Sequence, residues 1–243
     1  MENYEPAVSP VPARARHVRL AALLVAAAAL SLYEEGRLLL NEPVARYLPQ
    51  LAQMRVSAAG GSVPALRPMT IQDLMRHTAG LTYGNRGYAV YENNGLSSSD
   101  LVAERMSGEE FLQKLGALPL NFQPGSAWDY GFGFDVLGLA IEAVSGQSLA
   151  DFLRERLFGP LAMVDSGFVV PPEKSGRYAK CLSKDPLTGK PQAMRDGTRR
   201  NKFDCGGGGA VSTAADYLRF AQMLLDGGVI DGRRVLGRKT VAF

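Results

Sequence analysis

The stretch PGSAWDYG at residues 124–131 runs directly into FDVLG at residues 134–138 and closes with VSG at residues 144–146. Proline and glycine at its start favour a turn, and the apolar residues after Tyr130 recur with the period of a helix. Glycine at the end is typical of a helix stop. We therefore expect a turn that presents Tyr130, followed at once by a helix.

Two further stretches accompany this tyrosine turn. TIQDLMRHTAGL occupies residues 70–81, and a glycine-rich run leads from Gly206 to Thr213. Together the three stretches resemble the serine β-lactamase and penicillin-binding-protein superfamily, and most of all its class C-like esterases. The resemblance implies an α/β (α+β) fold, mainly its helical part, with much of the central antiparallel sheet missing. We expect an atypical basic and apolar segment at residues 1–31 and a partial β-lactamase-related domain at residues 32–243.

Acyl transfer in that superfamily needs a nucleophile that this sequence does not contain. A serine hydroxyl is protonated at neutral pH, so the family places a lysine one helical turn after it, in Ser-x-x-Lys. No Ser-x-x-Lys occurs in the sequence, and the family spacing to LYEEG at residues 32–36 puts the serine at about Arg19 and the lysine at about Ala22. Arginine cannot act as the acyl-accepting nucleophile, and the alanine side chain carries no base. We therefore expect a chain that is inactive or nearly so.

The other family positions are better matched. The resemblance assigns Tyr130 as the catalytic tyrosine because it follows Pro-Gly-x-x-Trp-x, although Gly131 and Phe132 stand where the family has Tyr-Ser-x or Tyr-x-Asn. It also places the glycine-rich turn, with Gly207 and Gly208 as substrate-binding residues, near the cleft. The expected ligand is a small-molecule ester or a β-lactam-like compound. The alternative is a non-catalytic relative that binds a ligand or partner through the old cleft.

Several other matches to family motifs are weak. Two literal Tyr-x-Asn sequences begin at Tyr83 and Tyr91, but both lack the Pro-Gly-x-x-Trp context, and we interpret them as loop residues. The third family motif, Lys/His/Trp-x-Gly on a strand, is not matched: Lys239-Thr240 is followed by Val241 and lies where a helix is expected.

Other catalytic chemistries find little support. A Ser-His-Asp arrangement would need one of two histidines: His77 matches a structural position in the family's His-Thr-x-Gly-Leu turn, and His17 has no candidate partner. A Gly-x-Ser-x-Gly elbow does not occur, and the four glycines at 206–209 lack the Gly-Lys-Ser/Thr of a phosphate loop. Two scattered histidines and two distant cysteines, Cys181 and Cys205, do not predict a metal site. We expect no cofactor.

Four helix starts are predicted by a hydroxyl residue three positions before a carboxylate. Each carboxylate would lie in the first turn, where the helix dipole favours it, and an apolar stripe follows each pair. Helix stops are expected at Gly80, at Gly159-Pro160 and at Gly227-Gly228. Only residues 167–170 and 210–211 indicate strand. The four pairs are Thr70 with Asp73, Ser107 with Glu110, Ser148 with Asp151, and Thr213 with Asp216.

The amino-terminal segment bears on where in the cell the protein is located. Basic residues precede an apolar run from Leu20 to Leu32, which is shorter than the roughly 20 residues of a spanning helix and continues into family-like sequence. We favour a buried helix over an export signal or membrane anchor, and hence a cytoplasmic protein in which Cys181 and Cys205 are reduced. Export or membrane association through the apolar run is the alternative.

The net charge of +3 does not point to a nucleic-acid partner. Nine basic residues lie between Lys174 and Lys202, in a stretch interrupted by glycine and proline. Aromatic stacking residues and a recognisable recognition helix are not evident there. The long polar stretches at residues 83–100 and 171–204 are predicted loops, which the resemblance places near the rim of the cleft.

Overall fold

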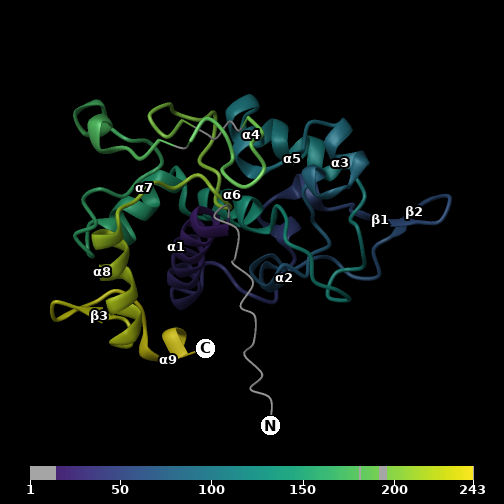
Figure 1. The fold of residues 1–243 in the computed structure, drawn as a ribbon. Helices are drawn as coiled ribbons and strands as arrows, with labels where there is room; N and C mark the ends of the chain where they lie inside the picture. The colour runs from purple at the N-terminus through teal and green to yellow at the C-terminus, as the bar shows by residue number, and fades with distance from the viewer. Residues whose placement is uncertain (1–14, 181, 192–195, 243) are drawn as a thin grey trace, which may run out of the picture.

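The computed structural model describes residues 15–180, 182–191 and 196–242. Helices α1 (Ala15–Glu34) and α6 (Gly133–Ser145) lie together near the middle of the molecule, and most of the other helices surround them (Figure 1). Their buried side chains belong to one continuous apolar core. The core therefore forms around α6, the helix that follows the tyrosine turn.

Helix α1 is built for close packing. Leu24, Val25, Ala28 and Leu32 are fully buried, and the helix contacts α6 and α7 (Leu149–Leu153). The predicted buried helix over the apolar run is confirmed for residues 21–32. Among the residues that the structure describes, no single helix is long and apolar enough to cross a membrane. One bent pair of helices, Gly133–Ser145 with Leu149–Phe158, is long and apolar enough when the two are taken together.

All four predicted helix starts are confirmed. In each, the hydroxyl of the cap residue accepts the backbone N–H of the carboxylate residue three positions later, which satisfies a donor that the helix itself leaves open. The Thr70 and Ser107 caps are full capping boxes, because the carboxylate also accepts the cap's own N–H. The helices that follow the four caps are α2 (Ile71–Arg76), α5 (Gly108–Gly116), α7, and α8 (Ala214–Leu225).

The first predicted helix stop is wrong. Helix α2 ends at Arg76 with His77 in the left-handed conformation at φ 57°, before Gly80 is reached. Gly80 is required for another reason, since a Cβ there would lie 2.4 Å from the carbonyl oxygen of Phe122. The other two stops are confirmed: α7 continues as a π-helical turn, η4 (Arg154–Phe158), up to Gly159, and Gly227 follows α8 with φ 63°.

Strands are short in the described part of the chain and lie elsewhere than predicted. Strand β1 (Arg55–Ala58) pairs antiparallel with β2 (Gly61–Pro64), and β3 (Val229–Ile230) pairs antiparallel with β4 (Arg233–Arg234). The expected strand at residues 167–170 reduces to one bridge between Gly167 and Val211. On one side the Val170 N–H donates to the Gly197 carbonyl and the Gly209 N–H donates to the Cys205 carbonyl, and on the other side the residues beyond 211 enter the cap of α8, so the ladder is not extended.

The two long polar segments contain short helices. Helix α3 (Ala89–Asn93) and the 3₁₀ turn η3 (Gly84–Arg86) fall within residues 83–100, which end in α4 (Ser99–Arg105). The remaining elements are η1 (Val44–Arg46), η2 (Pro49–Leu51), η5 (Pro172–Arg177) and α9 (Arg238–Ala242). Helix α9 contains the Lys239-Thr240 pair, as expected.

Candidate functional site

The tyrosine turn is hydrogen-bonded to the turn that follows α2. The Gly125 N–H donates to the Thr78 carbonyl at 2.8 Å, and the Asp129 N–H donates to the His77 carbonyl at 3.0 Å. The turn is thus held at both ends before the chain reaches Tyr130. Residues that are about 50 positions apart in sequence are brought together in this way.

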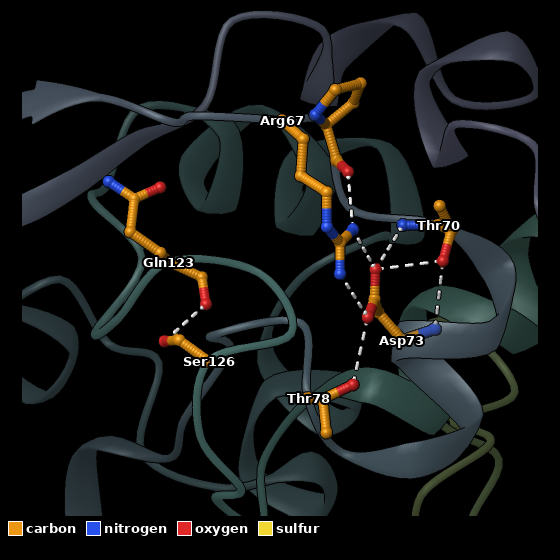
Figure 2. Close-up of polar contacts among 7 residues, drawn as sticks. Arg67, Thr70, Asp73, Thr78, Gln123 and Ser126 are labelled. Atoms are coloured by element: carbon orange, nitrogen blue, oxygen red, sulfur yellow. Dashed lines mark hydrogen bonds and ion pairs between the residues drawn. The ribbon is translucent and has the colours of Figure 1, made fainter.

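A buried carboxylate, Asp73, supports the same turn through Thr78 (Figure 2). Asp73 accepts Nη1 and Nη2 of Arg67 at 2.6 and 2.9 Å, the N–H and hydroxyl of Thr70, both at 2.9 Å, and the Thr78 hydroxyl at 3.0 Å. Burial alone would raise the pKa of Asp73, but these donors lower the pKa to about 2. Because Thr78 in turn accepts the Gly125 N–H, the Asp73 network also positions the tyrosine turn.

Tyr130 is half-buried among aromatic rings. Its ring centroid lies 4.5 Å from that of His77 and 5.7 Å from that of Tyr83, and His77 also packs on Phe134 at 5.2 Å. Burial lowers the pKa of His77 to about 4, against the opposing charge of Asp129. At neutral pH the imidazole next to Tyr130 is therefore uncharged, and the structural role of His77 stays a prediction.

The departure from the family after Tyr130 has a steric cause. A Cβ at Gly131 would lie 2.5 Å from both the Leu81 carbonyl oxygen and the Cα of Thr82, so this position has no room for serine. Phe132 is fully buried, with its ring 4.6 Å from that of Tyr83. Neither residue supplies the hydrogen-bonding group that the family places here.

A second buried carboxylate, Asp135, connects the tyrosine side of the site to the glycine-rich turn. Asp135 is fully buried in the first turn of α6, where it accepts the Ser99 hydroxyl at 2.7 Å and the Gly207 N–H at 3.0 Å. The hydroxyls of Ser99 and Tyr83 are 2.6 Å apart. Burial raises the pKa of Asp135 to about 7, and the charge of Asp100 adds to this. We call Tyr83, Ser99, Asp135 and Gly207 the buried network.

The glycine-rich turn packs against both central helices. A Cβ at Gly207 would lie 2.6 Å from the oxygens of Asp135 and Ser99, and one at Gly206 would lie 2.2 Å from the Phe134 carbonyl. Gly208 has more room, with its nearest neighbour, Asp100, at 3.5 Å. The N–H of Gly207 is thus used within the protein, and the substrate-binding roles predicted for Gly207 and Gly208 stay predictions.

Helix α1, which carries the position expected for the family lysine, approaches the glycine-rich turn at Val25. The side chain of Val25 would be 3.4 Å from a Cβ at Gly206. Ala22 precedes Val25 by three residues on α1, so both lie on one face of the helix. The assignment of the family lysine to about Ala22 stays a prediction. The side chains of Arg19 and His17, and the whole of Cys181, lie outside the described residues.

Sequence reasoning missed the buried network. Tyr83 was interpreted as a loop residue; it does lie outside a helix, but only 7 % of it is exposed and its hydroxyl contacts Ser99. The signal available in the sequence was Asp135, a lone carboxylate within the apolar run FDVLG. A buried carboxylate needs donors, and these come from segments far away in the chain.

The family model described as Beta-lactamase matches residues 23–242. The chain belongs to the β-lactamase family. Protein Rv1367c of Mycobacterium tuberculosis is 35 % identical over 229 residues, which are 88 % of this chain and 54 % of that protein. Esterase EstB of Burkholderia gladioli is 38 % identical over 148 residues, or 60 % of this chain and 36 % of EstB.

The solved structure of EstCE1, described as a hydrolase with promiscuous acyltransferase activity, has a TM-score of 0.73 at 25 % identity. The match covers 92 % of this chain and 60 % of EstCE1. The expected β-lactamase/transpeptidase-like fold is thereby confirmed, with mixed helices and small sheets. The chain spans about half the length of Rv1367c.

Proposed function

We propose that this chain derives from a serine hydrolase that cleaves esters or β-lactam-like amides through an acyl-enzyme, and that the chain itself is inactive or nearly so. The observation that carries the proposal is the combination of a well-held Tyr130 with a sequence that has no Ser-x-x-Lys. The printed names of EstB, an esterase, and EstCE1, a hydrolase, support the choice of substrate class.

The groups around Tyr130 do not replace the missing nucleophile and base. Ser99 is buried and hydrogen-bonded to Asp135, so a substrate cannot reach its hydroxyl. His77 has a pKa of about 4 and is a weak base at neutral pH. Asp135 has a pKa nearer to neutrality, but it lies fully buried behind Gly207. These groups therefore supply neither the activated nucleophile nor the base that acyl transfer needs.

The assigned positions of serine and lysine can be tested by restoring them. A fluorophosphonate probe labels serines that a neighbouring base has activated. We expect no labelling of the unmodified chain, labelling of the Arg19→Ser, Ala22→Lys double variant, and slower labelling when Tyr130→Phe is added. The Arg16→Ser, Ala22→Lys variant is the matched control for spacing. Equal labelling of both double variants, or of the unmodified chain, would contradict the proposal.

We also propose that much of the family's central sheet is missing from this chain. In support, the strands in the described part form only two hairpins, and the match covers about half of Rv1367c. Helix α8 also leaves Leu218 and Leu225, which lie two turns apart on one face, 66 % and 80 % exposed. A far-ultraviolet circular-dichroism spectrum dominated by helix is expected, and a strong strand component would argue against this proposal.

A non-catalytic binding role is the second candidate. It is favoured by the buried network, which connects the glycine-rich turn to Tyr83, and by the packing of the Tyr83 ring on Tyr130. Thermal unfolding in the presence of short-chain esters and cell-wall peptides tests it. Binding at this cleft is supported by a ligand that raises the melting temperature of the unmodified chain and raises that of Tyr130→Ala less. If no compound changes the melting temperature, the non-catalytic binding role is excluded.

A further inference from the structure

A cavity of about 470 Å³ lies near the end of α6 remote from Tyr130. Tyr130 precedes α6, whereas Glu142 in the cavity wall lies nine residues after Gly133, about 14 Å further along the helix. The other walls come from α5, from residues 200–204, and from Leu48, Gln50 and Ser148. None of its lining residues belongs to the tyrosine turn or the buried network. We call it the α6 cavity.

Three carboxylates line the cavity: Glu109 is exposed, whereas Glu142 and Asp204 form one part of the wall together. Glu142 accepts the Leu149 N–H at 2.7 Å, and Asp204 accepts the Ala150 N–H at 3.1 Å, so both are held by the first turn of α7. Burial raises the pKa of Glu142 to about 7, and the charge of Asp204 adds to this. A positive group placed between the two carboxylates would relieve this repulsion. The wall therefore favours a cation.

The rest of the lining combines buried apolar side chains with exposed charged ones. The side chains of Leu112, Leu139 and Phe203 are buried in the cavity wall, and we call them the apolar floor. Arg200 and Lys202 are exposed lining residues on the segment that leads to Phe203. Lys202 already donates to the Arg105 carbonyl at 2.8 Å. Arg200 is thus the cation best suited to an anionic group of a ligand.

We propose that the α6 cavity binds a zwitterionic α-amino acid with an apolar side chain. The ammonium group lies at Glu142 and Asp204, where each carboxylate accepts a charge-assisted hydrogen bond. The apolar floor receives the side chain, and Arg200 receives the carboxylate. This binding does not depend on acyl transfer, so it goes beyond the proposed function and stands or falls separately.

Calorimetric titration of the full chain with L-leucine at pH 7.5 tests the proposal. We expect saturable binding of leucine and at least about tenfold weaker binding of N-acetyl-L-leucine, which lacks the ammonium group, equivalent to about 1.4 kcal/mol. L-Leucinamide, which lacks the carboxylate, and glycine, which lacks the apolar side chain, should also bind more weakly. No binding of leucine, or equal binding of leucine and its N-acetyl derivative, would overturn the proposal.

Variants then place the ligand in the cavity. Glu142→Gln keeps a carbonyl that can accept the Leu149 N–H, so the fold is retained while leucine binding falls at least about tenfold. Ala143→Trp fills the cavity from its exposed rim without removing a carboxylate, and should abolish binding. Glu155→Gln, an exposed position outside the lining, is the matched control and should bind as the unmodified chain does. Unchanged binding in both cavity variants would rule out this site.

Discussion

Asp135 is the residue on which the candidate site depends most. It is fully buried, yet it holds the glycine-rich turn through Gly207 and reaches the tyrosine side through Ser99 and Tyr83. Its pKa is raised to about 7 because a charge is costly in this interior. The state of this carboxyl group therefore changes within the range of ordinary buffers.

The pH dependence of the free energy of unfolding should reveal the raised pKa of Asp135. In the folded chain the carboxyl keeps its proton to about pH 7, whereas in the unfolded chain it loses the proton near pH 4. Its contribution to the free energy of unfolding is complete below about pH 4 and is lost as the pH rises to about 7, on the order of 4 kcal/mol. Urea unfolding of Asp135→Asn should show a smaller decrease over this range.

The comparison of the unmodified chain with Asp135→Asn also controls for other groups that titrate in this range. Glu142 also has a raised pKa and lowers stability over the same pH window, but it does so equally in both proteins. The difference between the two unfolding curves therefore isolates Asp135. Parallel curves from pH 4 to pH 8 would show that this carboxyl group is ionised in the folded chain throughout.

His77 should titrate at unusually low pH. Burial against Tyr130 and Phe134 lowers its pKa to about 4, so the neutral ring stabilises the fold above about pH 6.5 and this contribution is lost as the pH falls to about 4. Nuclear magnetic resonance of the imidazole protons should give a midpoint near 4. In Tyr130→Ala the ring is more hydrated and the midpoint should rise towards 6.5; an unchanged midpoint would mean that Tyr130 does not shield it.

At the scale of helices and strands, features made by residues close together in the sequence could be predicted, whereas contacts between distant segments could not. The caps at Thr70, Ser107 and their equivalents were predictable, because each uses two residues three positions apart. The hairpin of β1 and β2 was not predicted, since its side chains are mostly exposed and show no alternation. The Tyr83 contact with Asp135 spans 52 positions and becomes visible only after the chain has folded.

Asp73 links helix α2 to the tyrosine turn, and replacing it should affect both. Asp73→Asn loses the ion pair with Arg67 and weakens the contact with Thr78, which we expect to cost about 2 kcal/mol of unfolding free energy. Because Thr78 holds Gly125, hydrogen exchange in residues 124–129 should also become faster.

The control for this experiment is Asp196→Asn. Asp196 is an exposed carboxylate that bonds locally to Thr198, so its replacement should change stability by less than about 0.5 kcal/mol. A loss of stability in Asp73→Asn without faster exchange at the tyrosine turn would confine the role of Asp73 to the start of α2.

For the whole molecule, the sequence predicted the family and the helical architecture but not the buried network. The tyrosine turn and the glycine-rich run were sufficient for the family because each is a local pattern. The network needs Ser99, Asp135 and Gly207 to meet, and the lone carboxylate Asp135 indicates a need for donors without indicating which segments supply them. The steric reason for Gly131 likewise depends on the approach of Leu81 and Thr82, which only the folded chain shows.

The central claim is that this chain keeps the tyrosine side of a serine hydrolase site without the nucleophile. The most direct test is the intact mass of the purified chain after incubation with a chromogenic short-chain ester, a chromogenic cephalosporin and a fluorescent penicillin. We predict an unchanged mass and no saturable turnover with any of the three. A stable acyl adduct, or turnover that saturates with substrate, would contradict the account.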